Sequence, residues 1–287
     1  MKTVLITGAS GFLGSHIIQA LRNDSRYELI CVDICKEKID LRGNGKALST
    51  EDFFNTNNLT IDVVINCAFA RGNDSAALVS ALDFNEKLIQ KLKGFSVGSI
   101  ISISSQGIYR SVQPGEFADE NGEIEPKEMY ALAKYAQERL FTSNFGGMIT
   151  NIRMASLSYN ARFLQFFVDS VRQGKDIVVT APHQYVSMID VKDAVAGILK
   201  VLEIPVSSRA AVYNLGAGQQ YSILELARLT NEIGVNLGYQ SVKVHDEDNG
   251  KQAAVGMNCE RLMNATGWKP QVDIREMIGT MFATQKG

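Results

Sequence analysis

The apolar residues in the first two-thirds of the chain fall in short runs separated by longer amphipathic stretches. The runs are rich in Val and Ile, as buried strands are, and the stretches between them repeat apolar residues at helical spacing. This alternation predicts a parallel sheet with helices on both faces, that is, a doubly wound α/β fold. The expected strands are Thr3–Thr7, Glu28–Asp33, Ile61–Cys67, Ser99–Ser104 and Gly147–Arg153, with helices at Gly11–Asn23, 74–93 and Lys127–Thr142. A further helix at Val191–Glu203 and a strand at Ala211–Leu215 extend the series.

The remaining segments are too scattered to join the sheet in order. They predict helices at Phe163–Gly174, Ser222–Ile233, Arg261–Thr266 and Ile274–Gln285, with a short strand at Ile177–Thr180. We therefore expect a sheet domain of residues 1–155 plus 187–215 and a smaller C-terminal lobe of residues 156–186 plus 216–287. The lobe is expected over the carboxyl ends of the strands, where open α/β sheets bind ligands.

Composition excludes several classes of function. The formal net charge of −2 gives no general attraction to nucleic acid or to anionic membranes. No apolar run approaches the roughly 18 residues that a membrane span needs. The three His and four Cys residues lack metal-ligand spacing, and Cys31 and Cys67 lie in or beside apolar runs as reduced thiols do. A cytoplasmic protein with no structural metal is expected.

A glycine-rich turn carries the sharpest local signal. The run from Thr7 to Gly14, TGASGFLG, follows the first strand and opens the first helix. Glycines also mark ordinary turns, but this strand–turn–helix context is typical of a dinucleotide site. Gly8 permits the tight turn, Gly11 lets the backbone approach a pyrophosphate, and Gly14 allows close packing of helix on strand. The pyrophosphate would then lie on the helix N-terminus, beside Phe12 and Leu13.

An acidic residue indicates which dinucleotide is bound. Asp33 ends the second strand, about 20 residues after the last glycine, where a carboxylate hydrogen-bonds the adenosine ribose. It would repel a 2′-phosphate, so NAD is expected in preference to NADP, with Ile34 beside it. Lys36 and Lys38 follow closely and weaken this discrimination. A solvated Asp at a strand end is the alternative interpretation.

A tyrosine and a lysine form the candidate catalytic pair. Tyr130 and Lys134 are four residues apart, on one face of a predicted helix. A positive charge beside a phenol favours the phenolate, and Lys134 with a positive nicotinamide ring would lower the Tyr130 pKa toward neutrality. Tyr130 would then exchange a proton with an alcohol or a carbonyl. Ser105, at the end of the fourth strand, would hydrogen-bond the reacting oxygen, although a polar strand end is an equal alternative.

Together these motifs resemble the extended short-chain dehydrogenase/reductase family, in particular its NAD-dependent epimerase/dehydratase group. The resemblance covers nearly the whole chain. It rests on the TGASGFLG opening, Asp33, Asp40-Leu41, the strand VVINCA at 63–68, Asn85, Ser105 with Tyr109, Tyr130-x-x-x-Lys134, the 187–196 segment, VYNLGAG at 212–218, and GWKP at 267–270. The resemblance implies that Ser105 and Tyr130 hold the reacting oxygen and that Lys134 binds the nicotinamide ribose. It also implies adenine contacts from Asp40 and Leu41, and cofactor contacts from Cys67, Ala68 and Phe69.

Three departures from the family pattern limit the functional interpretation. Dehydratases of this group carry Thr-Asp-Glu where this chain has Ser-Gln-Gly at 105–107, so dehydration is not expected. Ser156 replaces an Asn that often touches the sugar diphosphate. Val186 stands where an Arg commonly grips a phosphate, and an aliphatic side chain cannot pair with an anion. Either Arg162, His183 or another residue substitutes, or the substrate is not a nucleotide diphosphate sugar. Arg71, Arg110 and Arg162 are the available cations, and a surface charge is the alternative interpretation of each.

Three functions stay open. The first is an NAD-linked enzyme that acts on a sugar or nucleotide-sugar hydroxyl, as a 4-epimerase or a 4-keto-sugar dehydrogenase or reductase. The second is a reductase or dehydrogenase of a non-nucleotide carbonyl compound, which the missing Arg and Asn favour. The third is a cofactor-binding module without turnover. The resemblance also implies a homodimer through the helix that carries Tyr130 and the helix before it. Met129, Leu132, Ala136 and Leu140 form an apolar stripe there, which core packing explains equally well.

Overall fold

The computed structural model describes residues 1–250 and 253–284 of the chain. These residues form two compact units. Of the described residues, the first unit comprises 1–108, 126–153 and 195–213, and the second comprises 109–125, 154–194, 214–250 and 253–284.

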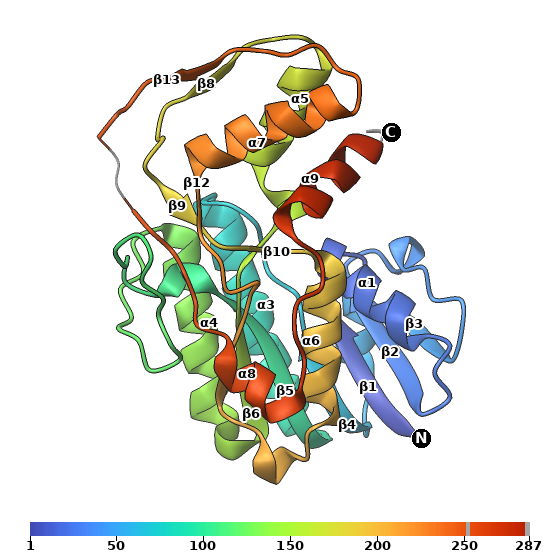
Figure 1. Ribbon diagram of the computed structural model, residues 1–287. Coiled ribbons are helices and arrows are strands. Elements are labelled where there is room, and N and C mark those ends of the chain that lie inside the picture. Colours follow the sequence, from blue (N-terminus) through green and yellow to red (C-terminus); the bar gives the residue numbers. More distant parts are fainter. Residues whose placement is uncertain (251–252, 285–287) are drawn as a thin grey trace. The chain divides into compact units, whose positions relative to one another are not determined.

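The first unit is built on a parallel sheet. Within the described residues the sheet has seven strands in the order β11-β6-β5-β4-β1-β2-β3 (Figure 1). The pairs β1–β2, β1–β4, β2–β3 and β4–β5 are parallel. The strands are β1 (Lys2–Thr7), β2 (Tyr27–Asp33), β3 (Gly45–Ser49), β4 (Thr60–Asn66), β5 (Ser96–Ser105), β6 (Ile149–Met154) and β11 (Val212–Leu215). The chain changes direction between β1 and β4, and such a switch point opens a crevice at the strands' carboxyl ends.

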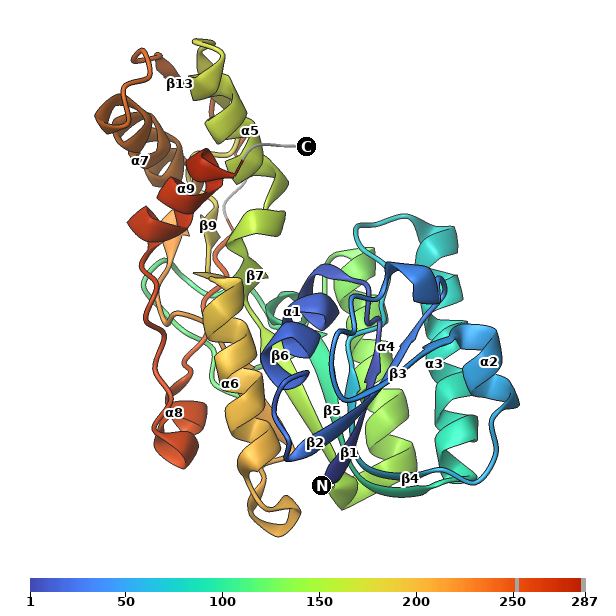
Figure 2. The ribbon, with the colours of Figure 1, turned by 90° about the vertical axis from the view of Figure 1, so that its right-hand side faces the viewer.

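Helices cover both faces of this sheet. They are α1 (Phe12–Leu21), α2 (Thr50–Asn55), α3 (Ser75–Lys93), α4 (Met129–Phe145) and α6 (Val191–Glu203). Figure 2 shows α1 and α6 on one face and α2, α3 and α4 on the other. The core under α2, α3 and α4 is aliphatic and aromatic, with Leu5, Val64, Leu88, Ile100 and Phe141 fully buried. Burial of such side chains stabilises the fold by about 1.5–3 kcal/mol each.

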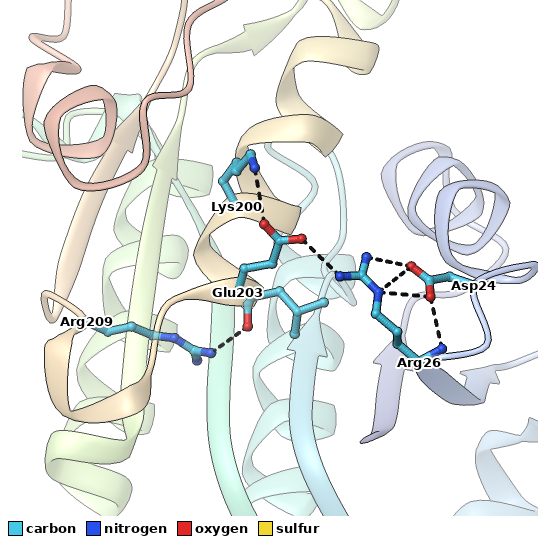
Figure 3. Close-up of polar contacts among 6 residues, drawn as sticks. Asp24, Arg26, Lys200, Glu203 and Arg209 are labelled. Carbon is cyan, nitrogen blue, oxygen red and sulfur yellow. Dashed lines mark hydrogen bonds and ion pairs between the residues drawn. The ribbon is translucent and has the colours of Figure 1, made fainter. Parts of the chain in front are cut away.

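Side chains at the amino ends of the strands hold the end of α6 (Figure 3). Arg26, just before β2, pairs with Asp24 at 2.7 Å and with Glu203 at 3.6 Å. These groups are partly exposed, so the pairs add little stability. Arg209 is more deeply placed and donates to the Leu202 carbonyl at 3.1 Å, which satisfies an end carbonyl of the helix. Burial lowers the pKa of Arg209.

The second unit has its own hydrophobic core. Leu164, Val168, Leu226, Ile278 and Met281 lie in a core cluster of three helices. The helices are α5 (Arg162–Arg172), α7 (Ile223–Asn236) and α9 (Ile274–Ala283), and a short α8 (Glu260–Thr266) lies between the last two in sequence. Short pairs of strands complete the unit: β7 (Ser156–Leu157) with β10 (Met188–Ile189), β9 (Tyr185–Val186) with β12 (Tyr221–Ser222), and β8 (Ile177–Val179) with β13 (Val244–Asp246).

The predicted α/β fold class is confirmed, and each predicted strand and helix has a counterpart. The predicted helix end at Gln285 lies outside the described residues. The sequence analysis missed β3 and α2. β3 is an edge strand of the sheet, and the burial of its residues is at most intermediate, so it carries no continuous apolar run. α2 is a six-residue helix that a Ser49 capping box initiates, which is too short for helical periodicity to reveal.

Candidate active site

The glycine-rich turn lies at the switch point of the sheet. Gly8 follows β1 with a φ of +66°, a conformation that favours glycine. A Cβ at Gly8 would come within 2.8 Å of the Ala68 backbone nitrogen, in the segment after β4. The turn and this segment therefore touch through their backbones, and the Cys67 backbone N–H donates to the Thr7 carbonyl at 3.2 Å. Three residues predicted to bind the cofactor thus converge at one point.

The start of α1 fits an anionic ligand. A Cβ at Gly14 would lie 2.2 Å from the Gly8 carbonyl oxygen, so only glycine lets the helix begin so close to the turn. Gly11 caps the helix without a side-chain hydrogen bond, and the first turn has no acidic residue. The N-cap residues of α4, α5 and α8 also form no side-chain cap, but α1 begins directly at the glycine-rich turn. Backbone N–H groups at Phe12, Leu13 and Gly14 suit a pyrophosphate, since a helix N-terminus attracts negative charge.

Asp33 is tied to the glycine-rich turn. Its Oδ2 accepts a hydrogen bond from the Ser10 backbone N–H at 2.9 Å, and its Oδ1 accepts one from the Ile34 N–H at 2.8 Å. These bonds fix the carboxylate beside the turn, where the sequence predicts the adenosine ribose. Ile34 exposes 87% of its surface, an apolar face next to that carboxylate. Both features fit the adenosine end of NAD.

The predicted adenine contacts are less developed. Asp40 forms ion pairs with Arg22 at 3.2 Å and with Arg42 at 2.8 Å, and these arginines lower its pKa. Leu41 is half-buried beside it. Both side chains belong to the connection between β2 and β3. Their role at the adenine stays a prediction.

Tyr130 lies in the first turn of α4, which a distant residue caps. The N-cap residue Glu128 forms no side-chain cap, but the Asn73 Oδ1 accepts from the Tyr130 backbone N–H at 2.9 Å. The Asn73 Nδ2 donates to the Glu128 carboxylate at 3.0 Å. Asn73 follows the Cys67–Phe69 segment, so the start of α4 is fastened to the segment that the cofactor is predicted to touch.

Ser105 lies close to the first turn of α4. Its Oγ accepts from the Gly107 backbone N–H at 3.1 Å. A Cβ at Gly107 would contact both the Ala131 Cβ at 3.4 Å and the Ser105 Oγ at 3.5 Å. Ser105 is half-buried, and the Gly107 backbone holds its hydroxyl. The structure therefore brings Ser105 beside the helix that carries Tyr130 and Lys134.

Lys134 is almost fully buried, at 3% exposed. Its Nζ donates to the Ile103 carbonyl at 2.8 Å and to the Gln137 Oε1 at 3.1 Å, and it lies 4.1 Å from the centre of the Phe69 ring. The same ring meets Tyr130 edge-on at 6.0 Å. Phe69, which sequence analysis gave only a cofactor contact, therefore contacts both members of the catalytic pair.

The pKa values of the pair are shifted in opposite directions. Burial raises the pKa of Tyr130 to about 12, while the positive charge of Arg71 opposes that shift. Burial lowers the pKa of Lys134 to about 7. The protein groups by themselves thus keep Tyr130 protonated at neutral pH. A lowered Tyr130 pKa stays a prediction that requires Lys134 and the nicotinamide charge together.

The buried lysine predicts a dependence of stability on pH. In the unfolded chain Lys134 has its ordinary pKa near ~10.4. Between pH 7 and pH 10 the unfolded chain therefore binds more protons than the folded chain, and the free energy of unfolding rises with pH. Lys134→Met removes this contribution. We expect the stability of the variant relative to wild type to fall by about 2 kcal/mol between pH 7 and pH 9 in urea titrations. A constant difference would contradict the assignment.

A buried ion pair fastens α4 to the neighbouring strands. Glu138, one turn after Lys134, accepts from the Arg153 Nη2 at 2.6 Å and from the Ser104 Oγ at 2.9 Å. The Arg153 and Glu138 side chains expose only 6% and 5%. Ser104 precedes Ser105 on β5, and Arg153 lies on β6. This pair therefore fixes α4 against both strands, one turn after Lys134.

The structural roles of four polar residues of this region were not predicted from the sequence. They are Asn73, Gln137, Glu138 and Arg153. One signal was available for Gln137. Tyr130, Lys134 and Gln137 are spaced i, i+4 and i+7, which places a third polar side chain on the catalytic face of the helix. Asn73 gave no local signal, because its partner is 57 residues away in sequence.

The described residues contain neither a membrane-spanning helix nor a metal site. No helix within residues 1–250 and 253–284 is long and apolar enough to cross a bilayer. In the same part of the chain, no group of three or more His, Cys, Asp or Glu side chains is arranged to hold a metal ion.

The turn, the acidic strand end and the Tyr–Lys helix together define a dinucleotide-binding enzyme of the Rossmann type. The chain belongs to the NAD-dependent epimerase/dehydratase family, whose family model matches residues 4–216. The enzyme is thus NAD dependent, as the sequence analysis expected.

Known proteins of similar sequence and structure agree with this assignment. The chain is 27% identical to a dTDP-4-dehydro-6-deoxy-D-allose reductase of Streptomyces bikiniensis, over 79% of this chain and 80% of that protein. It is 22% identical to a putative UDP-glucose 4-epimerase of Methanocaldococcus jannaschii, over 96% and 95%. The fold matches the crystal structure of a UDP-glucose 4-epimerase of Thermotoga maritima with UDP-glucose, with a TM-score of 0.78, 21% identity, and coverage of 98% and 97%.

Proposed function

We propose that this enzyme acts on a nucleotide sugar, either as a 4-epimerase or as a 4-keto-sugar reductase or dehydrogenase. The observation that carries the proposal is the placement of Tyr130 and Lys134. Both lie on α4 in the same compact unit as the glycine-rich turn, and the Phe69 ring contacts both. An acid or base is thereby held near the predicted dinucleotide site.

In the proposed mechanism Tyr130 exchanges a proton with the sugar hydroxyl at C4. NAD, when bound, supplies the hydride acceptor and donor. The Ser105 hydroxyl hydrogen-bonds the same sugar oxygen and orients it toward Tyr130. Lys134, which Ile103 and Gln137 hold, would donate to the nicotinamide ribose and would favour the phenolate.

The relatives support the choice of substrate class. A dTDP-sugar reductase and a putative UDP-glucose epimerase match most of the chain. Both named activities concern a hydroxyl or keto group of a nucleotide-linked sugar, and the same proton transfer serves epimerisation and reduction. The second unit would hold the sugar nucleotide, as the sequence analysis expects of the C-terminal lobe.

One observation favours the smaller-substrate alternative. Val186 lies in β9 and pairs with Tyr221 of β12, so the position that carries a phosphate-gripping Arg in the resembled family here offers an apolar side chain. Arg162, at the start of α5, is exposed. If neither Arg162 nor another candidate cation (Arg71, Arg110 or His183) replaces the missing Arg, the alternative substrate is a carbonyl compound without a nucleotide diphosphate.

The test is turnover of a panel of UDP- and dTDP-sugars with NAD and NADH, with chromatography of the products. Epimerised sugar without net NADH indicates an epimerase, and steady formation or consumption of NADH indicates a dehydrogenase or reductase. If the enzyme turns over small carbonyl compounds but no nucleotide sugar, the smaller-substrate alternative is established. Arg162→Met would then leave kcat/KM unchanged, whereas a role of Arg162 in gripping the diphosphate predicts about a tenfold loss with nucleotide sugars.

We also propose that the enzyme is a homodimer through α3 and α4. Met129 and Leu132 on α4 expose 51% and 57% of their surfaces, and Val79 on α3 exposes 57%. Apolar patches of this kind mark interfaces. Light scattering of the purified protein should give twice the mass of one chain, and Leu132→Lys should give a single chain that still folds. A wild-type monomer would contradict the proposal.

A further inference from the structure

Lys134 is connected to a row of buried polar side chains that its catalytic role alone does not require. The Thr7 Oγ1 donates to the Asn66 Oδ1 at 2.6 Å, and the Asn66 Nδ2 donates to the Asn85 Oδ1 at 2.7 Å. The Gln137 Nε2 donates to the same Asn85 oxygen at 3.2 Å. We call Thr7, Asn66, Asn85 and Gln137 the buried amide chain. Each exposes at most 1% of its surface.

The buried amide chain has a fixed direction. The Asn85 Nδ2 donates to the Ala81 carbonyl at 2.7 Å, so the Asn85 Oδ1 must face Asn66 and Gln137. Gln137 must therefore present its Nε2 to Asn85, because two facing oxygens would repel each other. The other end of the amide, Oε1, then faces the Lys134 ammonium and accepts from it at 3.1 Å. The network thus dictates that an acceptor, and not a donor, meets the lysine.

This arrangement has a physical consequence for a buried cation. An ammonium taken out of water must find acceptors, or it loses its proton. Lys134 has two, the Ile103 carbonyl and the Gln137 amide oxygen, and the Phe69 ring face lies on a third side. Within residues 1–250 and 253–284, the only side-chain acceptor for Lys134 is that of Gln137, and its orientation is set from β1 through β4 and α3.

We propose that Gln137 is a positioning residue for Lys134: its oriented amide oxygen holds the ammonium in place and keeps it charged for its work beside Tyr130. The part that concerns catalysis rests on the proposed function, whereas the part that concerns the charge of Lys134 does not. The buried amide chain thereby links the strand that precedes the glycine-rich turn to the catalytic lysine.

The titratable groups that face Lys134 are few. Cys67, from the segment after β4, interacts with the lysine charge, and burial raises the pKa of its thiol to about 12, so it is neutral at working pH. Tyr130 lies one turn earlier on α4 and stays protonated there. Glu138 lies one turn later and is paired with Arg153. The neighbouring β5, α3 and β1 contribute a carbonyl, an amide and a hydroxyl, none of which titrates. A change in the Lys134 titration on substitution of Gln137 would therefore report the amide acceptor.

The experiment follows the titration of Lys134 by carbon NMR of protein labelled at the lysine ε-carbons, with Lys134→Met to assign its signal. Gln137→Met should lower the titration midpoint of Lys134 by about one pH unit, the equivalent of one hydrogen bond to a charged group. Gln137→Glu, which replaces the amide oxygen with a carboxylate, should raise it and keeps the test possible if Gln137→Met does not fold. Asn151→Ala is the matched control, since Asn151 is another buried amide on the same unit, bonded to Thr142 instead of to Lys134.

The outcomes distinguish the positioning role of Gln137 from the proposed function of the enzyme. Opposite shifts in the two Gln137 variants, with none in Asn151→Ala, support the positioning role. Midpoints equal to wild type in both Gln137 variants overturn it, whatever the enzyme turns over. Where wild type turns over nucleotide sugars, Gln137→Met should lower kcat about tenfold with the KM for the sugar unchanged, and move the alkaline limb of the pH profile to lower pH. An unshifted profile would overturn the catalytic part, whereas a wild type without turnover would contradict the proposed function alone.

Discussion

Tyr130→Phe should lower kcat roughly a thousandfold with any substrate that wild type turns over, because it removes the only group proposed to exchange the proton. The ring and its edge-on contact with Phe69 are retained, so the fold around Lys134 should not change. We expect NAD affinity from calorimetry to stay within about twofold of wild type. The measurement is steady-state kinetics over a range of pH.

Tyr135→Phe is the matched control for this variant. Tyr135 is the other tyrosine of α4 and is also half-buried, but it lies next to Lys134 in sequence, off the face that Tyr130 and Lys134 share. Its loss of a hydroxyl should leave kcat nearly unchanged. Equal losses in the two variants would mean that the phenol of Tyr130 has no special chemical role.

The second large expected effect is a loss of stability when the buried ion pair between Arg153 and Glu138 is broken. Arg153→Met leaves the Glu138 carboxylate buried with only the Ser104 hydroxyl as a donor from the neighbouring strands. Removal of one partner of a buried pair costs about 3–5 kcal/mol, since the remaining charge is neither solvated nor paired. We expect the free energy of unfolding in urea to fall by that amount at neutral pH.

A double variant distinguishes the ion pair from a general packing defect. Arg153→Met combined with Glu138→Gln removes the unpaired charge, so it should recover roughly half or more of the lost stability. A double variant as unstable as the sum of its two single variants would contradict this explanation.

Most of the fold was predictable because buried parallel strands can be recognised in the sequence as continuous apolar runs. β1, β2, β4, β5 and β6 were predicted within a few residues for this reason. β3 was missed since a half-exposed edge strand has no such run. The pairing of β9 with β12 was not predictable either, because the two strands are short and distant in sequence.

The candidate site was predictable where chemistry is encoded locally. Gly8, Asp33 and the spacing of Tyr130 and Lys134 each gave a signal within a few residues, and the structure places all of them in one unit. The role of Gln137 was not encoded in this way. Its meaning depends on Asn85, whose own orientation is fixed by a carbonyl on α3.

The protonation states of Tyr130 and Lys134 were likewise not predictable from local sequence. Helical spacing correctly put a phenol and an ammonium on one face, but it carries no information on burial. Burial raises the pKa of Tyr130 and lowers that of Lys134, and the amount depends on tertiary contacts such as those of Phe69. Spacing alone therefore identified the pair and did not determine its protonation.

Transfer of an isotope label tests most directly whether Tyr130 and NAD together oxidise the C4 hydroxyl of a nucleotide sugar. The enzyme is mixed with NAD and a UDP- or dTDP-sugar deuterated at C4, the reaction is stopped with acid-free denaturant within one turnover, and the dinucleotide is analysed by mass spectrometry. We expect singly deuterated NADH from wild type and much less of it from Tyr130→Phe. Turnover of the sugar without deuterium in the dinucleotide would show that the C4 hydrogen is not transferred to NAD and would contradict the proposed mechanism.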